Sequence, residues 1–456
     1  MQERIRRYLD GVAKEKGRAI DVCLFGYGTT SSAVLKAIRE CGCIKELTVR
    51  QGGILYDRPD GSVRMISGTD AAKDIYEDVI FASPSVRREN LTLPHGTVIT
   101  SDTELFFEEK RKNVFCVSGS DGKSTVTTIA SLLLCPTFPR LFTGGNLGKP
   151  VASAPLDADA FLLELSSFNL RYARPHSKRA ILTNVTPNHL DWHASLDEYE
   201  ECKIRLIAFT NEAILPLSCP FNERLAKSIH TFALVSMQHP DKTLRESYDT
   251  QHTVTLSDDA ILLDGEPILK LDEVRRKEKH NIENLMSAIA LSIGYASKDR
   301  IRNVASTFQG LTHRCDVFNL GGKEYVDSSI DTTPERTKTT LESLGRHVHL
   351  ILGGRGKGLA PDTMKDALIR YAESISLYGD VTDSICEWLD SDPELSKIPR
   401  ARFDTLKDAI DNADSLAKEG ATVLLSPSAT AYGEFRNFKE RGDFFKNYLS
   451  KKHGQI

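Results

Sequence analysis

The segment that decides the fold is Val114-Phe115-Cys116-Val117-Ser118-Gly119-Ser120-Asp121-Gly122-Lys123-Ser124-Thr125. Its first residues are apolar and rich in β-formers, which predicts a short buried strand. Small, turn-forming residues follow, and the stretch from Thr125 to Leu134 then predicts a helix. A strand, a glycine turn and a helix N-terminus in this order direct backbone N–H groups and a positive dipole end at one point.

This arrangement predicts a phosphate-binding loop. Lys123 adds a cation, and the Ser124 hydroxyl can ligate Mg²⁺. The spacing Gly-x-x-Gly-Lys-Ser is shorter than the full nucleotide-binding pattern, because Val117 stands where the first glycine would be. A Gly/Lys/Ser cluster alone could be an ordinary loop, but the strand before it and the helix after it favour nucleotide binding. We expect nucleotide contacts from Gly119, Ser120, Asp121, Gly122, Lys123, Ser124 and Thr125.

Length and composition indicate a globular protein of several domains. The chain has 456 residues, about three domains by the usual length. Its hydrophobic content of 40% is ordinary, and its net charge of −4 suggests no nucleic-acid or membrane surface. No apolar run approaches the ~20 residues that span a bilayer, and the start lacks the apolar core of a secretory signal. The nine scattered cysteines predict reduced thiols in a cytoplasmic protein.

Residues 1–110 are predicted to form a Rossmann-like N-terminal domain. A strand over 19–25 leads into a glycine turn at 26–32 and a helix over 33–40. The next strand ends in Arg50, whereas dinucleotide enzymes usually place an acid there to hold the ribose. We therefore disfavour NAD and expect another phosphate-bearing ligand, with Arg50 as a candidate contact. The alternative is a structural unit in which Arg50 is a solvated strand end.

Residues 111–311 are predicted to form a central P-loop-type ATPase domain. The carboxyl ends of parallel strands collect ligands, so we expect Lys123, Glu164 and His189 to converge there. Glu164 interrupts the apolar strand over 160–168, where a carboxylate is costly unless it is paired. Mg²⁺ is its expected partner beside a phosphate loop, and a buried cation of the protein is the alternative.

Three other polar residues of this segment have ordinary explanations on the sequence alone. A lone histidine such as His189 most often packs or forms a hydrogen bond. Lys203 lies in the amphipathic stretch 196–209 and by default would be a surface lysine. Asn284 could present its amide to an adenine edge, or it could belong to a polar helix start.

Residues 312–456 are predicted to form a Rossmann-like C-terminal domain, which makes the fold α/β with three domains. Strands are expected at 324–329, 348–352 and 422–429, with helices between them. The basic glycine turn that follows residue 352 favours an anion site over a plain surface turn.

The order of these motifs resembles that of the Mur ligases, ATP-dependent amide-forming enzymes of peptidoglycan synthesis. The resemblance covers essentially the whole chain, and it rests on residues 118–125, the Glu164 strand, 184–191, 280–284 and His313-Arg314. A narrower match points to the branch that joins D-glutamate to UDP-N-acetylmuramoyl-L-alanine, and it rests on residues 144–148, 164–168, 426–429 and 435–442.

The resemblance implies that the three domains bind the UDP-sugar, ATP and the amino acid in chain order. ATP would phosphorylate the L-alanine carboxylate, and the D-glutamate amine would attack the acyl phosphate. Among the residues, the resemblance implies catalytic roles for Lys123, His189 and a carbamylated Lys203, and two Mg²⁺ held by Ser124, Glu164, His189 and Lys203. It places Asn284, Arg314 and Asp327 on ATP, Thr30, Arg50 and Asn146 near the sugar nucleotide, and Thr332, Lys357 and Phe438 near D-glutamate. We expect a cytoplasmic monomer.

One departure from the family concerns the amino-acid site. The family usually carries Asn-Asp-Ser-Lys-Ala-Thr-Asn at the start of the third domain, where this chain has Val326-Asp327-Ser328-Ser329-Ile330-Asp331-Thr332-Thr333-Pro334. The lysine is missing whether Ser329 or Ile330 takes its place, although Thr332 can keep the role of the threonine. Ala431 also falls where a serine is common.

Two alternative functions stay open at this point. A sister Mur ligase or a folylpolyglutamate-type ligase would share the ATP site but add another amino acid. The Asp-Asn-Pro-Arg signature of the diaminopimelate- and lysine-adding sisters is absent. The other alternative is a nucleotide-binding regulator without ligase activity, against which the intact Lys123, Glu164, His189 and Lys203 argue.

Overall fold

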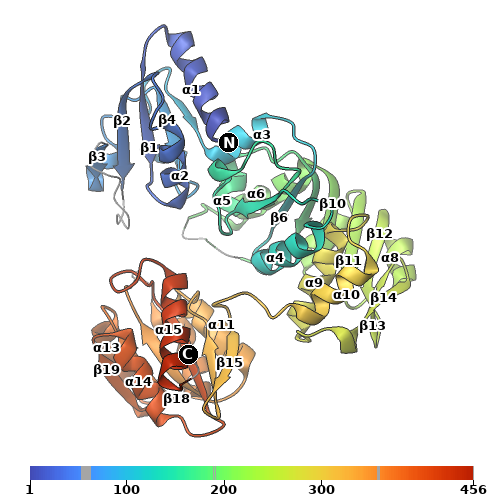
Figure 1. Ribbon diagram of the computed structural model, residues 1–456, viewed down its shortest axis with the longest axis vertical. Coiled ribbons are helices and arrows are strands. Elements are labelled where there is room, and N and C mark those ends of the chain that lie inside the picture. Colours follow the sequence, from blue (N-terminus) through green and yellow to red (C-terminus); the bar gives the residue numbers. More distant parts are fainter. Residues whose placement is uncertain (53–62, 188, 190–191, 357–359, 455–456) are drawn as a thin grey trace. The chain divides into compact units, whose positions relative to one another are not determined.

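The protein folds into two compact units, Met1–Phe308 and Gln309–Ile456 (Figure 1). The computed structural model describes residues 1–52, 63–187, 189, 192–356 and 360–454. The first unit holds two sheets and the second unit holds one, and each sheet falls in one of the three predicted segments. The predicted α/β class with three domains is confirmed. No helix within the described ranges is long and apolar enough to cross a membrane.

The first sheet is parallel throughout, with the strand order β3-β2-β1-β4-β5. Its elements are α1 (Gln2–Lys16), β1 (Ile20–Phe25), α2 (Thr29–Ile38), β2 (Ile44–Gln51), β3 (Arg64–Ser67), β4 (Val79–Ala82), β5 (Val98–Thr100) and α3 (Asp102–Glu108). Helix α2 begins four residues before its predicted start, because the extended Gly28 serves as its N-cap. The hydroxyl residues assigned to the turn therefore form the first helical turn.

Arg50 is a buried residue that links the end of β2 to the segment 71–77. Its side chain is 1% exposed, and Nε donates to the equally buried Glu77 at 2.8 Å. The other guanidinium donors bond the backbone carbonyls of Ala71, Lys73 and Asp74. The solvated strand end was therefore a wrong expectation, and Arg50 has no exposed donor for the predicted contact with a ligand.

We expect Glu77→Ala to destabilise the first unit by about 3–5 kcal/mol, because it leaves the Arg50 cation buried without its partner. Urea unfolding measures the change. Glu46→Ala is the matched control, since it removes the partner of Arg64 in a pair whose side chains are 56% and 35% exposed. That loss should be at most about 1 kcal/mol. Equal losses of unfolding free energy in the two variants would contradict a stabilising role of the buried Arg50–Glu77 pair.

The central sheet has the order β14-β13-β12-β11-β10-β9-β6-β8-β7 and is parallel except at its β12-β13-β14 edge. Its strands are β6 (Val114–Ser118), β7 (Leu141–Gly145), β8 (Ala160–Glu164), β9 (Ser177–Leu182), β10 (Thr210–Pro216), β11 (Thr231–Ser236), β12 (Thr250–Leu256), β13 (Ala260–Leu263) and β14 (Glu266–Lys270). Its helices are α4 (Lys123–Leu134), α5 (Ser167–Tyr172), α6 (Leu196–Ala208), α7 (Pro220–Ala226), α8 (Asp241–Ser247), α9 (Lys279–Leu291) and α10 (Lys298–Thr307).

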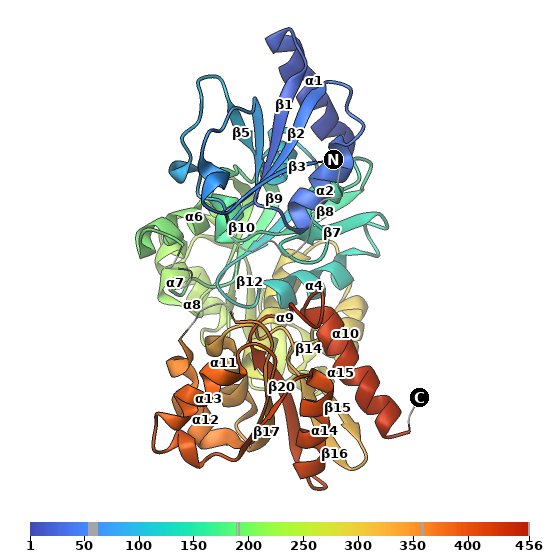
Figure 2. The same cartoon turned by 90° about the vertical axis from the view of Figure 1, so that its left-hand side faces the viewer.

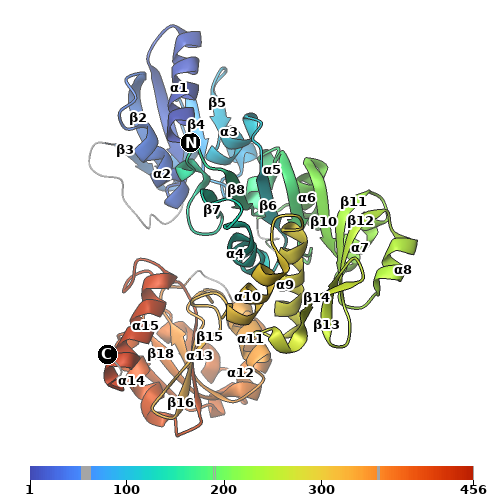
Figure 3. The ribbon, with the colours of Figure 1, turned by 45° about the vertical axis from the view of Figure 1, so that its right-hand side comes forward.

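Side-chain alternation along β6 explains how helices cover both faces of this sheet. Phe115 and Val117 pack into a core shared with α4, α9 and α10. These three helices lie side by side (Figure 3). Val114 and Cys116 point to the other face, into a core that also holds residues of α5, α6 and the first sheet. This shared core joins the first two domains into one unit.

The third sheet has the order β15-β16-β20-β17-β18-β19, and only the β15–β16 pair is antiparallel. Its strands are β15 (Asp316–Leu320), β16 (Lys323–Asp327), β17 (Val348–Gly353), β18 (Ala372–Tyr378), β19 (Arg400–Phe403) and β20 (Thr422–Ser428). One face packs on α11 (Pro334–Leu344), α12 (Lys365–Tyr371) and α13 (Thr382–Asp390), and the other on α14 (Leu406–Leu416) and α15 (Phe438–Lys452) (Figure 2).

Candidate active site at the phosphate loop

The loop between β6 and α4 is folded tightly against the end of β9. Gly119 has a φ of 143°, and a Cβ there would overlap the Thr183 hydroxyl and lie 3.0 Å from the Asn184 amide nitrogen. The Asn184 side-chain oxygen accepts hydrogen bonds from the backbone N–H groups of Ser120 and Asp121, at 3.1 and 2.9 Å. The loop therefore takes its shape from a glycine that can approach β9 closely and from one amide that holds it there.

Two lysine amines meet at this loop. Lys123 Nζ donates to the carbonyls of Gly119 and Ser120, at 2.9 and 2.7 Å. Lys203 Nζ donates to the same Gly119 carbonyl at 2.7 Å and to Ser118 Oγ at 3.1 Å. Helix α4 begins at Lys123, two residues before its predicted start, so Lys123 and Ser124 lie in its first turn.

Lys203 is a buried residue of α6, with 2% exposure, so the surface-lysine explanation is wrong. Burial, reinforced by the charge of Lys123, holds the pKa of Lys203 well below its ordinary value. A neutral amine is the form that can react with CO₂, and a lysine in water is almost never neutral at pH 7. The enclosure of Lys203 therefore favours the neutral amine over the cation, which is the direction that carbamylation would require.

Glu164 ends β8 and lies beside Val117 of β6 in the parallel register. It is 1% exposed, and its Oε1 accepts from Asn146 Nδ2 at 2.7 Å. Its Oε2 is buried without any hydrogen-bond partner. The structure shows no ion pair of Glu164 with a described cation, so the alternative of a buried protein partner is not supported.

The unpartnered oxygen of Glu164 fits a divalent cation. The described part of the chain holds no group of three or more His, Cys, Asp or Glu side chains placed for a metal. Mg²⁺ commonly takes only one or two protein carboxylates and completes its shell with phosphate oxygens and water. Glu164, with the Ser124 hydroxyl in the first turn of α4, is such a sparse donor set.

His189 has a left-handed backbone, with a φ of 54°. Its ring lies 5.1 Å from that of Phe168, and its carbonyl accepts from the amides of Trp192 and His193. Sequence reasoning missed His193, which is 3% exposed and bonds both Ser167 and Glu198. The only sequence signal for it was a second histidine four residues after the first.

A cavity of about 260 Å³ between the first two sheets brings together Thr30 and Asn146, both predicted near the sugar nucleotide. Asn146 also holds Glu164, so one side chain borders both the cavity and the candidate metal site. Sequence reasoning missed several other residues of the wall, among them Ser83, Asp102, Thr103 and Asn169. They lie at loops and helix starts that the chain's motifs did not single out.

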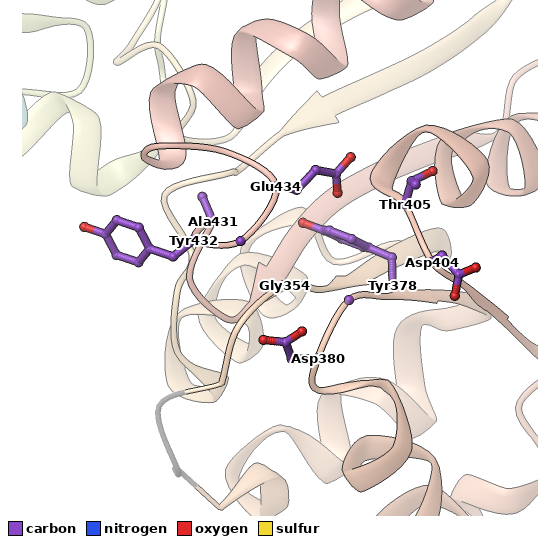
Figure 4. A pocket seen from close by; sticks show the side chains of 10 residues that line it. Gly354, Tyr378, Asp380, Asp404, Thr405, Ala431, Tyr432 and Glu434 are labelled. Atoms are coloured by element: carbon purple, nitrogen blue, oxygen red, sulfur yellow. The ribbon is translucent and has the colours of Figure 1, made fainter. Parts of the chain in front are cut away.

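The second unit has its own cavity, of about 280 Å³, at the carboxyl ends of β17, β18 and β20 (Figure 4). Its wall is formed by Gly354, Tyr378, Gly379, Asp380, Asp404, Thr405, Ala431, Tyr432, Gly433 and Glu434. Of the residues predicted near D-glutamate, Thr332 and Phe438 do not line this cavity, and Lys357 lies outside the described residues.

The residues predicted on ATP divide between the units. Asn284 of α9 lies against the loop, since a Cβ on Gly122 would overlap its amide oxygen. Arg314 and Asp327 belong to the second unit. Asp327 is 0% exposed and accepts from Ser329 N at 3.0 Å, while its other oxygen lies 2.6 Å from His313 Nδ1. The ribose contact of Asp327 stays a prediction, as does the phosphate contact of Arg314.

Comparison with known proteins identifies the family. Residues 117–292 match the Mur ligase middle domain. The UDP-N-acetylmuramoylalanine–D-glutamate ligase of Ruminiclostridium cellulolyticum is 32% identical over 389 residues, which cover 82% of this chain and 83% of that protein. The ligase of the same name from Clostridium kluyveri is 30% identical, over 88% of both chains.

The chain belongs to the Mur ligase family. This family carries out ATP-dependent amide ligation of peptidoglycan precursors. Solved structures share the fold at low identity. MurF of Acinetobacter baumannii has a TM-score of 0.55 at 15% identity, with 93% of this chain and 91% of that chain covered. A pseudomurein peptide ligase type C of Methanothermus fervidus has a TM-score of 0.53 at 13% identity, with 94% and 99% covered.

We expect Gly119→Ala to abolish measurable ATP binding, because its Cβ would displace Thr183 and Asn184 from the loop. Calorimetric titration with ATP and Mg²⁺ measures the affinity. Gly294→Ala is the control, since Gly294 also has a positive φ, of 80°, but has open space around it. Near-normal affinity in Gly119→Ala would show that the loop does not depend on this close approach.

Proposed function

We propose that this chain joins D-glutamate to UDP-N-acetylmuramoyl-L-alanine, using ATP and forming an acyl phosphate. The observation that carries the proposal is the meeting of Lys123 and Lys203 at the Gly119 carbonyl, with the Glu164 carboxylate on the neighbouring strand. The names of the relatives, at about 30% identity over most of the chain, support D-glutamate as the amino acid.

The chemistry requires charge stabilisation on oxygen atoms. During phosphoryl transfer, negative charge gathers on the transferred group, so the site needs cations and donors rather than a nucleophilic side chain. Lys123 would turn from the loop carbonyls to the phosphates, and the N–H groups at the start of α4 would bind them. Mg²⁺, when bound, would neutralise phosphate charge, and Ser124 and Glu164 are the residues that would hold it.

Lys203 would act as a carbamate, which forms when its neutral amine attacks CO₂ and releases a proton. The product replaces a cationic nitrogen with anionic oxygens beside the loop. Those oxygens, with His189, would serve a second Mg²⁺. This assignment rests on the enclosure of Lys203 and on the family resemblance.

The amino-acid site must work without the usual lysine. Ser329 is 0% exposed, and its hydroxyl is held between the Phe438 carbonyl, at 2.8 Å, and Arg441 Nε, at 2.9 Å. Position 329 is thus an internal position of the second unit, where a lysine would not reach a ligand without rearrangement. We infer that Lys357, Thr332 and the backbone near Phe438 contact D-glutamate instead.

A phosphate-release assay tests the function. We expect wild-type enzyme with ATP and UDP-N-acetylmuramoyl-L-alanine to release phosphate with D-glutamate, and not with L-glutamate, L-lysine or diaminopimelate. Lys123→Ala should lower the rate by a factor of about 100 or more, because a cation that serves transition-state charge is lost. Release with another amino acid alone would reassign the chain to a sister ligase, and no release with any amino acid would favour a regulator.

We expect Lys203→Ala to be nearly inactive and short carboxylic acids to restore part of its activity, because their oxygens can occupy the place of the carbamate. Phosphate release with and without added acetate measures the rescue. Lys227→Ala is the control, because the Lys227 side chain is 58% exposed. This variant should keep wild-type activity, and acetate should not alter it. Full activity of Lys203→Ala would remove Lys203 from the reaction.

A further inference from the structure

His193 bridges two segments that the proposed reaction uses. Its Nε2 lies 2.9 Å from Ser167 Oγ, and its Nδ1 lies 3.1 Å from Glu198 Oε1. The side chain is 0% exposed, and its ring packs against the rings of Phe168 and Tyr199, at centroid distances of 5.8 and 5.2 Å. Both ring nitrogens therefore have a hydrogen-bond partner, which fixes the orientation of the ring.

Each partner of His193 lies within five residues along the chain of one of the candidate ligands. Ser167 starts α5, three residues after Glu164 at the end of β8. Glu198 lies in the first turn of α6, five residues before Lys203. The histidine thus links the end of β8 to the start of α6, two segments without a direct backbone connection.

The hydrogen-bond roles of His193 follow from its partners. A carboxylate can only accept, so Nδ1–H donates to Glu198, and Nε2 accepts from the Ser167 hydroxyl. Burial, which outweighs the bond to Glu198, holds the pKa of His193 below its ordinary value. This direction favours the neutral ring, with its proton on Nδ1, which suits both partners.

Glu198 is itself fixed from two other directions. Arg171 of α5 reaches Oε1 at 2.6 Å, and Arg87 of the first domain reaches Oε2 at 3.4 Å. Arg87 also lies over the Trp192 ring, 5.4 Å from its centroid, and donates to the Trp192 carbonyl. With Arg171, Arg87 and His193 on its carboxylate, Glu198 is held in place, and its bond to His193 contributes to fixing the first turn of α6.

Helix α6 reaches the phosphate loop at two places. Tyr199 OH lies 2.7 Å from Ser120 Oγ, and Lys203 bonds Ser118 and Gly119. Any shift at the start of α6 would therefore move both contacts relative to Glu164. Catalytic geometry tolerates little such movement, since displacement of about 1 Å can lower rates by about 100-fold.

We propose that His193 is a positioning residue, which holds the end of β8 and the start of α6 at the spacing in which Glu164 and Lys203 act on the same phosphates. This rests on the proposed function of the loop. Both ring nitrogens of His193 are already engaged by Ser167 and Glu198, so we infer that it acts through these two residues rather than on the nucleotide.

The test compares variants that keep both, one or none of its bonds. His193→Phe keeps the ring but loses both bonds, and we expect kcat to fall by about 10–100-fold, the usual range for outer-shell partners. His193→Asn and His193→Gln place one amide where Nδ1 or Nε2 stood, and each should recover part of that loss. The KM values for ATP, sugar nucleotide and amino acid should stay within about 3-fold, because no substrate contact is removed.

A matched control separates positioning from general packing. His349 of β17 is 8% exposed and lies between Ser374, at 2.9 Å, and Glu373, at 3.3 Å, in the second unit. His349→Phe deletes the same kinds of bond from a buried histidine, yet kcat should stay within 2-fold of wild type. Rates are normalised to the ATP-binding fraction, so that loss of folded protein does not count.

If His193→Phe does not fold, Ser167→Ala provides the test instead. It removes only the hydroxyl that bonds His193 Nε2, and it should lower kcat while the KM values stay unchanged. Wild-type kcat in Ser167→Ala, or in a folded His193→Phe, overturns the proposal, as does a change confined to KM. The assay uses whichever amino acid the wild-type enzyme accepts. If the enzyme uses another amino acid but not D-glutamate, only the proposed function is refuted. If it is inactive with every amino acid, both the proposed function and the role of His193 are refuted.

Discussion

The Gly119 carbonyl is the point on which this site depends. It accepts from both Lys123 and Lys203, and its direction is set by a backbone conformation that only glycine adopts easily. Two amines cannot share one carbonyl as full cations without repulsion. Burial reduces this conflict, because it holds the pKa of Lys203 well below its ordinary value and so favours the neutral amine over the cation.

The order of strands in the central sheet explains why these groups meet. Strands β9, β6, β8 and β7 are neighbours and parallel, so their carboxyl ends lie along one edge. β9 leads to Thr183 and Asn184, which shape the loop. β6 leads into the loop, β8 ends in Glu164 and β7 leads to Asn146. Residues separated by more than 60 positions in the chain thus form one site, as expected of an open α/β sheet.

Much of this arrangement was predictable from the sequence, because the apolar runs and glycine turns are local signals. The strand, loop and helix at Lys123 and the amphipathic helix of Lys203 are where their patterns indicate, to within two residues. The strand expected over 160–168 ends instead at Glu164, because Ser166 caps α5, which begins at Ser167. Burial of single polar residues was not predictable. Arg50 and Lys203 look like exposed residues of a strand end and a helix, and only tertiary contacts enclose them. His193 was missed for the same reason, since one of its two partners, Ser167, lies 26 residues earlier in the chain.

A crystal structure with ADP and Mg²⁺ tests most directly whether the loop, Glu164 and Lys203 form one phosphate-transfer site. The account predicts Mg²⁺ about 2.0–2.1 Å from Glu164 Oε2, Lys123 Nζ on the phosphates, and carboxyl density on Lys203 Nζ. A nucleotide bound with Mg²⁺ away from Glu164, and a plain Lys203 amine still on the Gly119 carbonyl, would contradict it.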